Sequence, residues 1–568
     1  MLHDARYPAH SLPVDLSTPT PALVAQRAVQ RLPRIALLLF CAAYVVPGVF
    51  GRDPWKSADI AAFGAMVNVA QGRTDWLSPE VGGVAVEIAP LPYALGALFI
   101  RVLQPLLEPS LAARIPFALL LVATLVLTWY ATFHLARSDA AQPLPFAFGG
   151  EANLIDYART IADGAVLAVI ATLGLLQLGH ETTPELVQLA AATLFMYGLA
   201  ASPYRSSRSR LALLAALPVL AASGAPSMAL AFGAAGLLVA WRSGDTPMRR
   251  IAPWLLASMA LAVAVASALH AWRWRAAGYA SAQDVALLLR LLAWFIWPAW
   301  PLALWTLWRW RSHWADRHIA VPLASALVGL GACIAMGASD RALMLAVPAV
   351  AVLAAFALPT LKRSLSAAID WFSVCFFSIA ALTIWVIYVS MQTGVPAQPV
   401  ANVLRLAPGF VPRFSPFILA VALAGSLAWV WLVKWRTGRH RHALWKSLVL
   451  PASGVALCWL LLMTLWLPLL DYARSFRPLI VRIAQHVPAN ACLAAPGLTR
   501  AQLAALEYHG HYRVDGRAGA ENGACRYLLR SETVRRPPPA PAGWTLVARE
   551  RRPTDRDERI AIFRRNAR

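Results

Sequence analysis

Charge is scarce in this chain. Asp, Glu, Lys and Arg make up 14% of its 568 residues, whereas soluble domains carry roughly 25%. Acidic residues are the scarcest, with 28 Asp and Glu against 51 Lys and Arg. The sequence also has no glycine-rich loop of the kind that cradles nucleotide phosphates. These absences exclude an ordinary soluble domain and give no support to a nucleotide-dependent enzyme.

Long hydrophobic runs take the place of charge. Hydrophobic residues supply 59% of the sequence, and Trp alone occurs 23 times. Runs of about 17 to 25 apolar residues recur, and each is long enough to cross a bilayer. The net charge of +23 lies in short Lys and Arg clusters between these runs, which is typical of cytoplasmic loops or contacts with anionic lipid and does not indicate nucleic acid. We therefore expect a polytopic membrane protein.

The basic loops set the expected topology. Fourteen apolar runs begin between residues 34 and 447, and they include 91–107 and 185–203. A cytoplasmic N-terminus places residues 51–90 and 137–162 outside, and cytoplasmic basic loops then require that one run does not cross. We expect residues 185–203 to form that exception, a helix at the cytoplasmic interface. The predicted fold class is thus all-α, with about 13 transmembrane helices.

Composition divides the chain into three parts. Residues 1–33 are polar and Pro-rich and are expected to form a cytoplasmic tail, followed by a membrane domain over 34–470. Residues 471–568 indicate a small α/β domain outside the membrane, with helices near 474–487 and 499–508. Its strands are expected near 492–495, 526–529, 544–549 and 559–564.

Cysteine is rare, with six residues in the chain. Two of them, Cys492 and Cys525, lie in the polar C-terminal part. They could form one disulfide if that part faces an oxidising compartment, and the sequence leaves open whether they do. The others lie in apolar runs and are expected to pack as small hydrophobic side chains. These are Cys41, Cys333, Cys375 and Cys458.

The loop 51–90 gathers carboxylates beside the membrane. Asp53 followed by proline is a typical helix start, so the sequence predicts a helix over 54–71 with Asp53 as its N-cap. Lys56 and Asp59 follow at three-residue intervals and share a face with Asp53. The structural alternative is that Asp53 only caps the helix and Lys56 pairs with Asp59.

Two further carboxylates are expected on the same side of the membrane. Glu87 ends the loop before the next apolar run, and Asp163 lies where another run begins. Their structural alternatives are an interfacial carboxylate and a helix-terminal Asp favoured by the dipole. Carboxylates beside a cation suit sugar transfer from a lipid phosphate, because a carboxylate can take the acceptor's proton and a cation can stabilise the leaving phosphate. His180-Glu181 falls on the expected cytoplasmic side, and we expect it to be structural.

Five motifs, in order along residues 35–360, carry a resemblance. Residues 53–60, Asp-Pro-Trp-Lys-Ser-Ala-Asp-Ile, are similar to a box Asp-Glu-x-Arg-Tyr-Ala-Glu-Ile. Residues 72–79 resemble Gly-Asp-Trp-x-x-Pro, and residues 87–93 resemble Glu-Lys-Pro-Pro-Leu-x-Tyr. Residues 108–116 fit an Arg-Leu-Pro box, and residues 340–348 fit Arg-Tyr-Leu-x-Pro. The chain thus resembles the polyprenyl-phosphate-sugar glycosyltransferases of the GT-C superfamily, in particular the lipid A aminoarabinose transferases and protein O-mannosyltransferases.

The resemblance implies roles for these residues. Asp53 would be the principal catalytic carboxylate and Asp163 its partner. Lys56 would lie near the donor phosphate, and Glu87 would line the same cavity and bind a divalent metal in some family members. The resemblance also implies inversion at the anomeric carbon. The further substrate-binding residues expected are Asp59, Glu87 and Tyr93.

One cation of the family pattern is absent. Ile88 stands where the family has a lysine after the glutamate. Arg273, Arg275 or Arg341 is expected to supply the positive charge, and His270 is a candidate metal ligand. A divalent metal is the one cofactor considered.

The predicted function is transfer of a sugar from a polyprenyl-phosphate donor to a lipid, glycan or protein acceptor. We expect it at the periplasmic face of a bacterial inner membrane, with membrane lipids and no nucleic acid as partners. A transporter or flippase would favour polar residues or broken helices at mid-membrane, whereas runs such as 319–337 are almost wholly apolar in their middles. A third alternative is a scaffold of the same fold that has lost catalysis. The sugar and the acceptor stay open.

Overall fold

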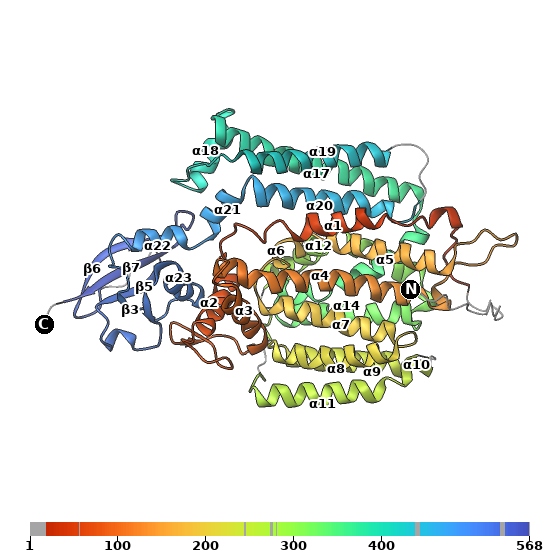
Figure 1. Ribbon diagram of the computed structural model, residues 1–568, viewed down its shortest axis with the longest axis horizontal. Coiled ribbons are helices and arrows are strands. Elements are labelled where there is room, and N and C mark those ends of the chain that lie inside the picture. The colour runs from red at the N-terminus through yellow and green to blue at the C-terminus, as the bar shows by residue number, and fades with distance from the viewer. Residues whose placement is uncertain are drawn as a thin grey trace.

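Helices form most of the structure, a computed structural model that describes residues 19–55, 57–243, 246–272, 276–279, 281–437, 443–533 and 540–566. They assemble into one bundle, and a smaller domain with a β-sheet lies at one end of it (Figure 1). We call this the domain end, where residues 46–55 and 172–183 meet residues 465–477. At the opposite end, residues 19–33 contact residues 137–153.

The bundle contains helices of 9 to 31 residues. They are α1 (Arg34–Val45), α4 (Pro109–Ala136), α5 (Leu154–Ala171), α7 (Pro184–Ala201), α8 (Ser206–Ala222), α9 (Pro226–Arg242), α11 (Ala252–Ala268), α12 (Ala282–Phe295), α13 (Ala299–Arg309), α14 (Arg317–Ala335), α16 (Val347–Ala355), α17 (Arg363–Thr393), α19 (Pro416–Thr437) and α20 (Lys446–Thr464). Further helices connect them: α6 (Leu175–Leu178), α10 (Thr246–Arg249), α15 (Asp340–Met344), α18 (Ala397–Leu406) and α21 (Leu467–Arg474).

The length and hydropathy of the helices fit a polytopic membrane protein. Within the described residues, seven helices are long and apolar enough to cross a bilayer. An eighth crossing would be α12 with α13, which are bent by 87° at their junction. Shorter apolar helices such as α1 and α9 run beside them (Figure 1). The all-α membrane fold is confirmed, while the number of thirteen crossings stays a prediction.

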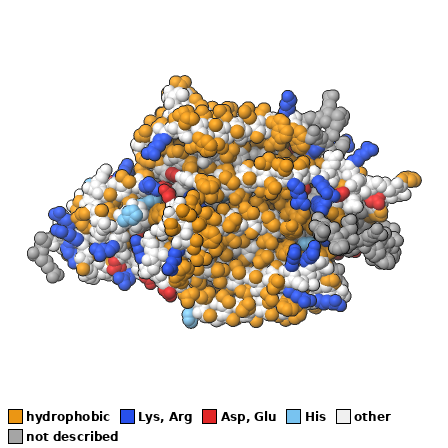
Figure 2. Space-filling view, viewed as in Figure 1, with side chains coloured by type: hydrophobic (Ala, Val, Ile, Leu, Met, Phe, Trp, Pro, Cys, Tyr) orange, Lys and Arg blue, Asp and Glu red, His pale blue; other side chains and the backbone are white. Residues whose placement is uncertain are grey.

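Apolar side chains cover the flank of the bundle, and charged ones gather toward its two ends (Figure 2). Only 11% of the apolar window of α19, and 28% of that of α17, is buried inside the protein. By contrast, 83% of the window of α20 is buried, where it packs on α5 and α17. Apolar helices that bury so little surface against protein need lipid around them, so α17 and α19 form a lipid-facing rim.

The loop expected over 51–90 is a folded layer at the domain end. It holds α2 (Ala58–Ala70), then β1 (Glu80–Val81) antiparallel to β2 (Val84–Ala85). The run 91–107, expected to cross, forms α3 (Pro90–Leu103), which packs on α2 at this end (Figure 1). That prediction was wrong because α1 ends and α4 begins at this same end, where Arg114 bonds the carbonyl of Val49, so the chain between them does not cross.

The run 185–203 was expected not to cross, and here too the structure differs from the expectation. It forms α7, an 18-residue helix that is apolar enough to cross and 78% buried between α4 and α8. The expectation of a helix at the membrane interface was wrong, because the polar residues before and after this run form its two end loops. Because α3 does not cross and α4 does, residues 137–153 lie at the opposite end, where the amide of Ala152 donates to the carbonyl of Val24, and not on the side of residues 51–90.

The C-terminal part folds as an α/β domain. Its five-stranded sheet has the order β4-β3-β5-β7-β6, with parallel pairs around β3 and antiparallel pairs around β7. The strands are β3 (Cys492–Ala494), β4 (Arg513–Asp515), β5 (Tyr527–Thr533), β6 (Trp544–Glu550) and β7 (Glu558–Arg565). Helices α22 (Arg477–Ile483) and α23 (Arg500–Gly510) pack beside them. Cys492 and Cys525 are joined in a disulfide.

Candidate functional site

Asp53 is held by the C-terminal part of the chain. Helix α2 begins at Ala58, with Ser57 before it, so the prediction that Asp53 caps a helix over 54–71 was wrong. The Asp53 carboxylate accepts hydrogen bonds from Arg477 instead, at 2.6 Å from Nη2 and 2.9 Å from Nε. Burial raises the pKa of Asp53, but the Arg477 hydrogen bond and charge outweigh it and lower the pKa overall.

Asp59 is the buried centre of a polar network. One carboxylate oxygen accepts from the amide and hydroxyl of Thr182, both at 2.9 Å. The other accepts from the Trp55 amide at 3.1 Å and from Arg52 Nη2 at 3.3 Å. Burial raises the pKa of Asp59, yet the charges of Arg52 and Arg114 lower it more. Asp59 is thus an ionised anchor that ties α2 to the loop before α7, and does not point at a ligand.

Glu181 is a second buried carboxylate at the domain end. Its side chain is 4% exposed and receives Arg341 Nη2 at 2.5 Å and Gln177 Nε2 at 2.9 Å. Burial and the nearby Asp59 charge raise the pKa of Glu181. Glu181 lies at the same end as residues 51–90, and not at the opposite end as the expected topology required, because α3 does not cross the bundle before it. Its expected structural role stays a prediction.

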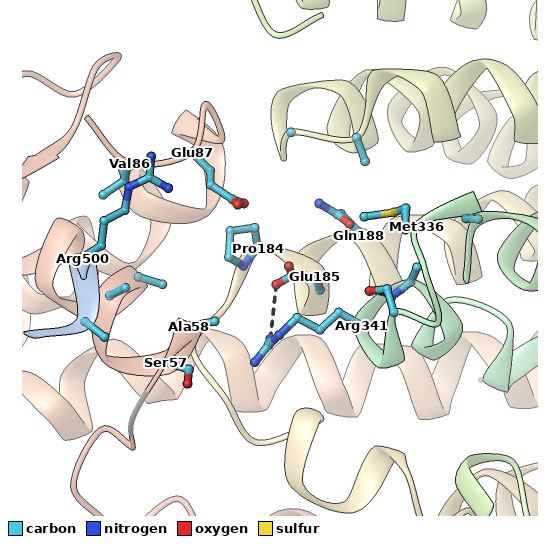
Figure 3. Close-up of a pocket in the computed structure, with 18 of the residues that line it drawn as sticks. Ser57, Ala58, Val86, Glu87, Pro184, Glu185, Gln188, Met336, Arg341 and Arg500 are labelled. Carbon is cyan, nitrogen blue, oxygen red and sulfur yellow. Dashed lines mark hydrogen bonds and ion pairs between the residues drawn. The ribbon is translucent and has the colours of Figure 1, made fainter. Parts of the chain in front are cut away.

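A cavity of about 1320 Å³ opens beside this network (Figure 3). Its walls come from the start of α2, the segment 84–93, the starts of α7 and α9, the end of α14 and the C-terminal domain. The wall from the bundle is apolar, and the following residues line it: Met228, Ala231, Leu327, Val328, Ala332 and Leu345. An apolar wall with a few convergent polar groups is typical of a site for an amphipathic ligand.

Charged side chains lie on the other walls of the cavity. Glu87 and Glu185 point toward it, and Arg341 reaches it from α15 (Figure 3). Arg341 also contacts Glu185 at 3.5 Å and donates to the Thr183 hydroxyl at 3.1 Å. Burial lowers the pKa of Arg341, but the charges of Glu181 and Glu185 outweigh it and raise the pKa overall. The sequence predicted Glu87, Tyr93 and Arg341 as substrate-binding residues, and all three line this one cavity.

The C-terminal domain closes one side of the cavity. The Glu507 carboxylate of α23 accepts from Asn68 Nδ2 at 2.8 Å and from the Gly82 amide at 3.0 Å. The Gly516 amide donates to the Gly82 carbonyl at 2.7 Å. These bonds fix α23 on α2 and the β1–β2 hairpin, so domain and membrane bundle share one site. No local sequence pattern predicts this contact, because its partners lie hundreds of residues apart.

Asp163 lies away from this site. It sits within α5 and accepts a hydrogen bond from Trp129 Nε1 at 2.8 Å. One turn earlier on α5, Thr160 bonds the carbonyl of Val29 at the opposite end. The expected partnership of Asp163 with Asp53 failed because it relied on placing residues 137–162 at the domain end.

The remaining predicted residues fall into two groups. Lys56, Arg273 and Arg275 lie outside the described residues. His270 follows α11 as an exposed residue and does not line the cavity, so it does not join Glu87. Among the described residues no three His, Cys, Asp or Glu side chains come together as a metal site. The donor set expected for a metal is therefore not assembled here, and no step of the proposed chemistry passes through one.

The structure is thus a bundle of apolar helices with a small sheet domain docked at one end and a cavity at their junction. No family model matches the sequence, and no curated protein matches it. Two crystal structures of ArnT from Cupriavidus metallidurans are similar, one bound to undecaprenyl phosphate (TM-score 0.61) and one in the apo state (0.60). Each is 13% identical over 93% of this chain and 97% of the other. The likeness confirms the fold that the sequence motifs predicted.

Proposed function

We propose that this protein is an integral-membrane glycosyltransferase. It takes a sugar from a polyprenyl-phosphate donor and transfers it to an envelope acceptor, which is a lipid, glycan or protein. The reaction takes place in the cavity at the domain end. The observation that carries the proposal is the composition of that cavity, which joins an apolar wall from the membrane helices to Glu87, Glu185 and Arg341. The similar ArnT was crystallised with undecaprenyl phosphate, an amphipathic ligand of the kind this cavity would take.

The proposed chemistry balances with groups at this site. An acceptor oxygen forms a bond to the anomeric carbon, and the bond from that carbon to the phosphate oxygen breaks. The electron pair leaves with the polyprenyl phosphate, where Arg341 stabilises the negative charge. The acceptor proton goes to a carboxylate that faces the cavity, for which Glu87 and Glu185 are placed. Attack opposite the phosphate inverts the anomeric carbon.

The proposed role of Asp53 as a catalytic carboxylate requires a rearrangement. Asp53 is paired with Arg477, and the cavity wall begins at Ser57. Opening the Asp53–Arg477 pair would free a carboxylate at the edge of the cavity. In the described conformation Asp53 instead holds α22 to the bundle.

We also propose that the domain end faces the periplasm. The disulfide between Cys492 and Cys525 supports this orientation, because such bonds persist in oxidising compartments. Arginines at the opposite end, including Arg137 and Arg205, agree with a cytoplasmic location.

The test is mass spectrometry of envelope lipids, glycans and proteins from cells that lack the gene. We expect one sugar modification to disappear, to return with the wild-type gene, and to stay absent with Arg341→Gln or Glu87→Gln. The Asp53→Asn variant tests the role of Asp53. If this variant fully restores the sugar modification, Asp53 is not a catalytic residue. An unchanged profile in the deletion strain would favour the scaffold, and a modified donor retained on the cytoplasmic side would favour a flippase.

A further inference from the structure

Building on the proposed function, we propose that Arg500 of the C-terminal domain binds the phosphate of the polyprenyl-phosphate donor. The sheet domain would then be part of the donor site and not only a cover over it. The proposal starts from Ile88, which follows the cavity residue Glu87 and brings no positive charge to this wall of the site.

The arginines that line the cavity differ in whether their side chains already form ion pairs with carboxylates. Arg341 bonds Glu181 at 2.5 Å and contacts Glu185 at 3.5 Å. Arg552 forms a two-point pair with Asp555, at 2.6 and 2.7 Å. Arg500 is exposed to the cavity and, within the described residues, forms no ion pair or hydrogen bond through its side chain. It is therefore the cation there whose binding capacity is free for a ligand.

Arg500 also reaches the right place. It is the first residue of α23, and its side chain extends toward the segment that carries Val86 and Glu87, next to Ile88 (Figure 3). A guanidinium at this point can supply the charge that Ile88 lacks, from another part of the fold.

The position of Arg500 is fixed by packing. Gly64 of α2 lies so close to Ala504 of α23 that an added Cβ would be 2.5 Å from the Ala504 Cβ. The Glu507 bonds to Asn68 and Gly82 hold the same helix three residues further on. Since α23 cannot slide on α2, the start of α23 stays over the cavity. The backbone of Arg500 is therefore held beside the cavity, and its guanidinium can bind a phosphate there through two parallel N–H donors.

The carboxylates that face the cavity strengthen the need for this cation. Glu87, Glu185, Asp555 and Glu558 line it together with three arginines. Four carboxylates against three arginines leave one net negative charge, and loss of Arg500 would raise this to two, so Arg500 lowers the electrostatic repulsion that a phosphate meets there. A lipid without a phosphate would have no such requirement.

The experiment is native mass spectrometry of the detergent-solubilised full chain titrated with undecaprenyl phosphate. We expect Arg500→Gln to weaken binding about tenfold, as for the loss of one charge-assisted hydrogen bond, and Arg500→Lys to weaken it less. Arg526→Gln is the matched control, since Arg526 is an exposed arginine of the same domain that does not line the cavity. Unfolding temperatures of all variants show whether they are folded.

Titrations with other ligands show which part of undecaprenyl phosphate Arg500 recognises. Undecaprenol, which has no phosphate, should bind wild type and Arg500→Gln equally, whereas inorganic phosphate and phosphatidic acid report binding of any phosphate or any anionic lipid. Equal binding of undecaprenyl phosphate by wild type and folded Arg500→Gln would overturn the proposal, as would an equal loss in Arg526→Gln. Restoration of binding in Glu87→Gln/Arg500→Gln would also overturn it, because Arg500 would then only balance Glu87. If wild type itself does not bind undecaprenyl phosphate, the proposed function fails before this inference is tested.

Discussion

Charged side chains make different kinds of contact at the two ends of the helical bundle. At the opposite end, arginines lie on aromatic rings, as Arg137 does 4.3 Å from the centre of the Tyr204 ring, or form exposed pairs such as Arg31 with Asp156. At the domain end, ion pairs are buried or connect distant segments, as Arg341 with Glu181 and Arg477 with Asp53 do. The first arrangement keeps positive charge available at a membrane surface. The second holds the walls of a cavity in place.

Removing the buried carboxylate of the domain end should have the largest effect. Asp59→Ala leaves Arg52 buried without its partner carboxylate, and breaking such a pair costs about 3–5 kcal/mol of unfolding free energy. Denaturant titration of the detergent-solubilised protein measures it. The matched variant at the opposite end is Asp156→Ala, whose exposed pair with Arg31 should contribute no more than about 1 kcal/mol. Similar losses in both variants would remove the distinction between the two ends.

Loss of the disulfide should destabilise the sheet domain next most strongly. Cys492 and Cys525 are separated by 33 residues, and closing a loop of that size stabilises a fold by about 3–4 kcal/mol on the chain-entropy account. In Cys492→Ser/Cys525→Ser, amide hydrogen exchange should quicken in β3 and β5 while the helices of the bundle keep their protection. Uniform protection throughout the variant would contradict this.

The Glu507→Ala variant tests how much the Glu507 hydrogen bonds stabilise the contact between the C-terminal domain and the bundle. Glu507→Ala leaves the Asn68 amide and the Gly82 N–H without their acceptor, which costs about 1–3 kcal/mol for each buried unsatisfied group. Hydrogen exchange should rise at residues 80–85 on the bundle side of the contact. Glu521→Ala, which removes a partly exposed pair with Arg530 in the same domain, is the control and should leave residues 80–85 protected.

The pH dependence of the unfolding free energy tests whether burial and the nearby Asp53 shift the pKa of Asp471 at the domain end. Burial raises the pKa of Asp471 to about 7, with the Asp53 charge adding to the effect and the Trp55 hydrogen bond opposing it. A folded-state pKa above the unfolded value of about 3.9 means that the folded protein binds more protons, so this group makes stability fall as pH rises from about 4 to about 7. Asp471→Asn should flatten that part of the stability–pH curve. An unchanged slope would show that Asp471 titrates normally.

The smallest effect on function is expected from Asp163→Asn. Asp163 touches Trp129 inside the bundle and does not line the cavity, so the sugar modification should stay within about twofold of wild type, the effect of a few tenths of a kcal/mol. Mass spectrometry of the complemented deletion strain measures it, beside Arg341→Gln. Loss of the modification in Asp163→Asn would return this residue to the site.

The sequence predicted those features that depend on local patterns. Strands near 492–495, 544–549 and 559–564 follow from short alternating runs, and the structure has β3, β6 and β7 there. The cavity residues Glu87 and Tyr93 followed from ordered motifs.

What the sequence could not give are pairings over long distances. Asp53 fits a helix cap until Arg477, 424 residues away, takes its carboxylate. The roles of 91–107 and 185–203 were exchanged, because both choices leave the same number of crossings and only packing on α2 or α4 distinguishes them. Glu181 was placed at the wrong end through that exchange, and Arg500 was missed because it lies in a separate domain.

The central claim is that the cavity at the domain end holds a polyprenyl phosphate. A cryo-EM structure of the protein in lipid nanodiscs with undecaprenyl phosphate tests it most directly. The account predicts phosphate density in the 1320 Å³ cavity near Arg341 and Arg500, with the lipid chain along the apolar wall of α9 and α14. Density instead in the neighbouring cavity of about 900 Å³ beside Tyr279 and Arg290, or an unfilled cavity at the domain end, would contradict it.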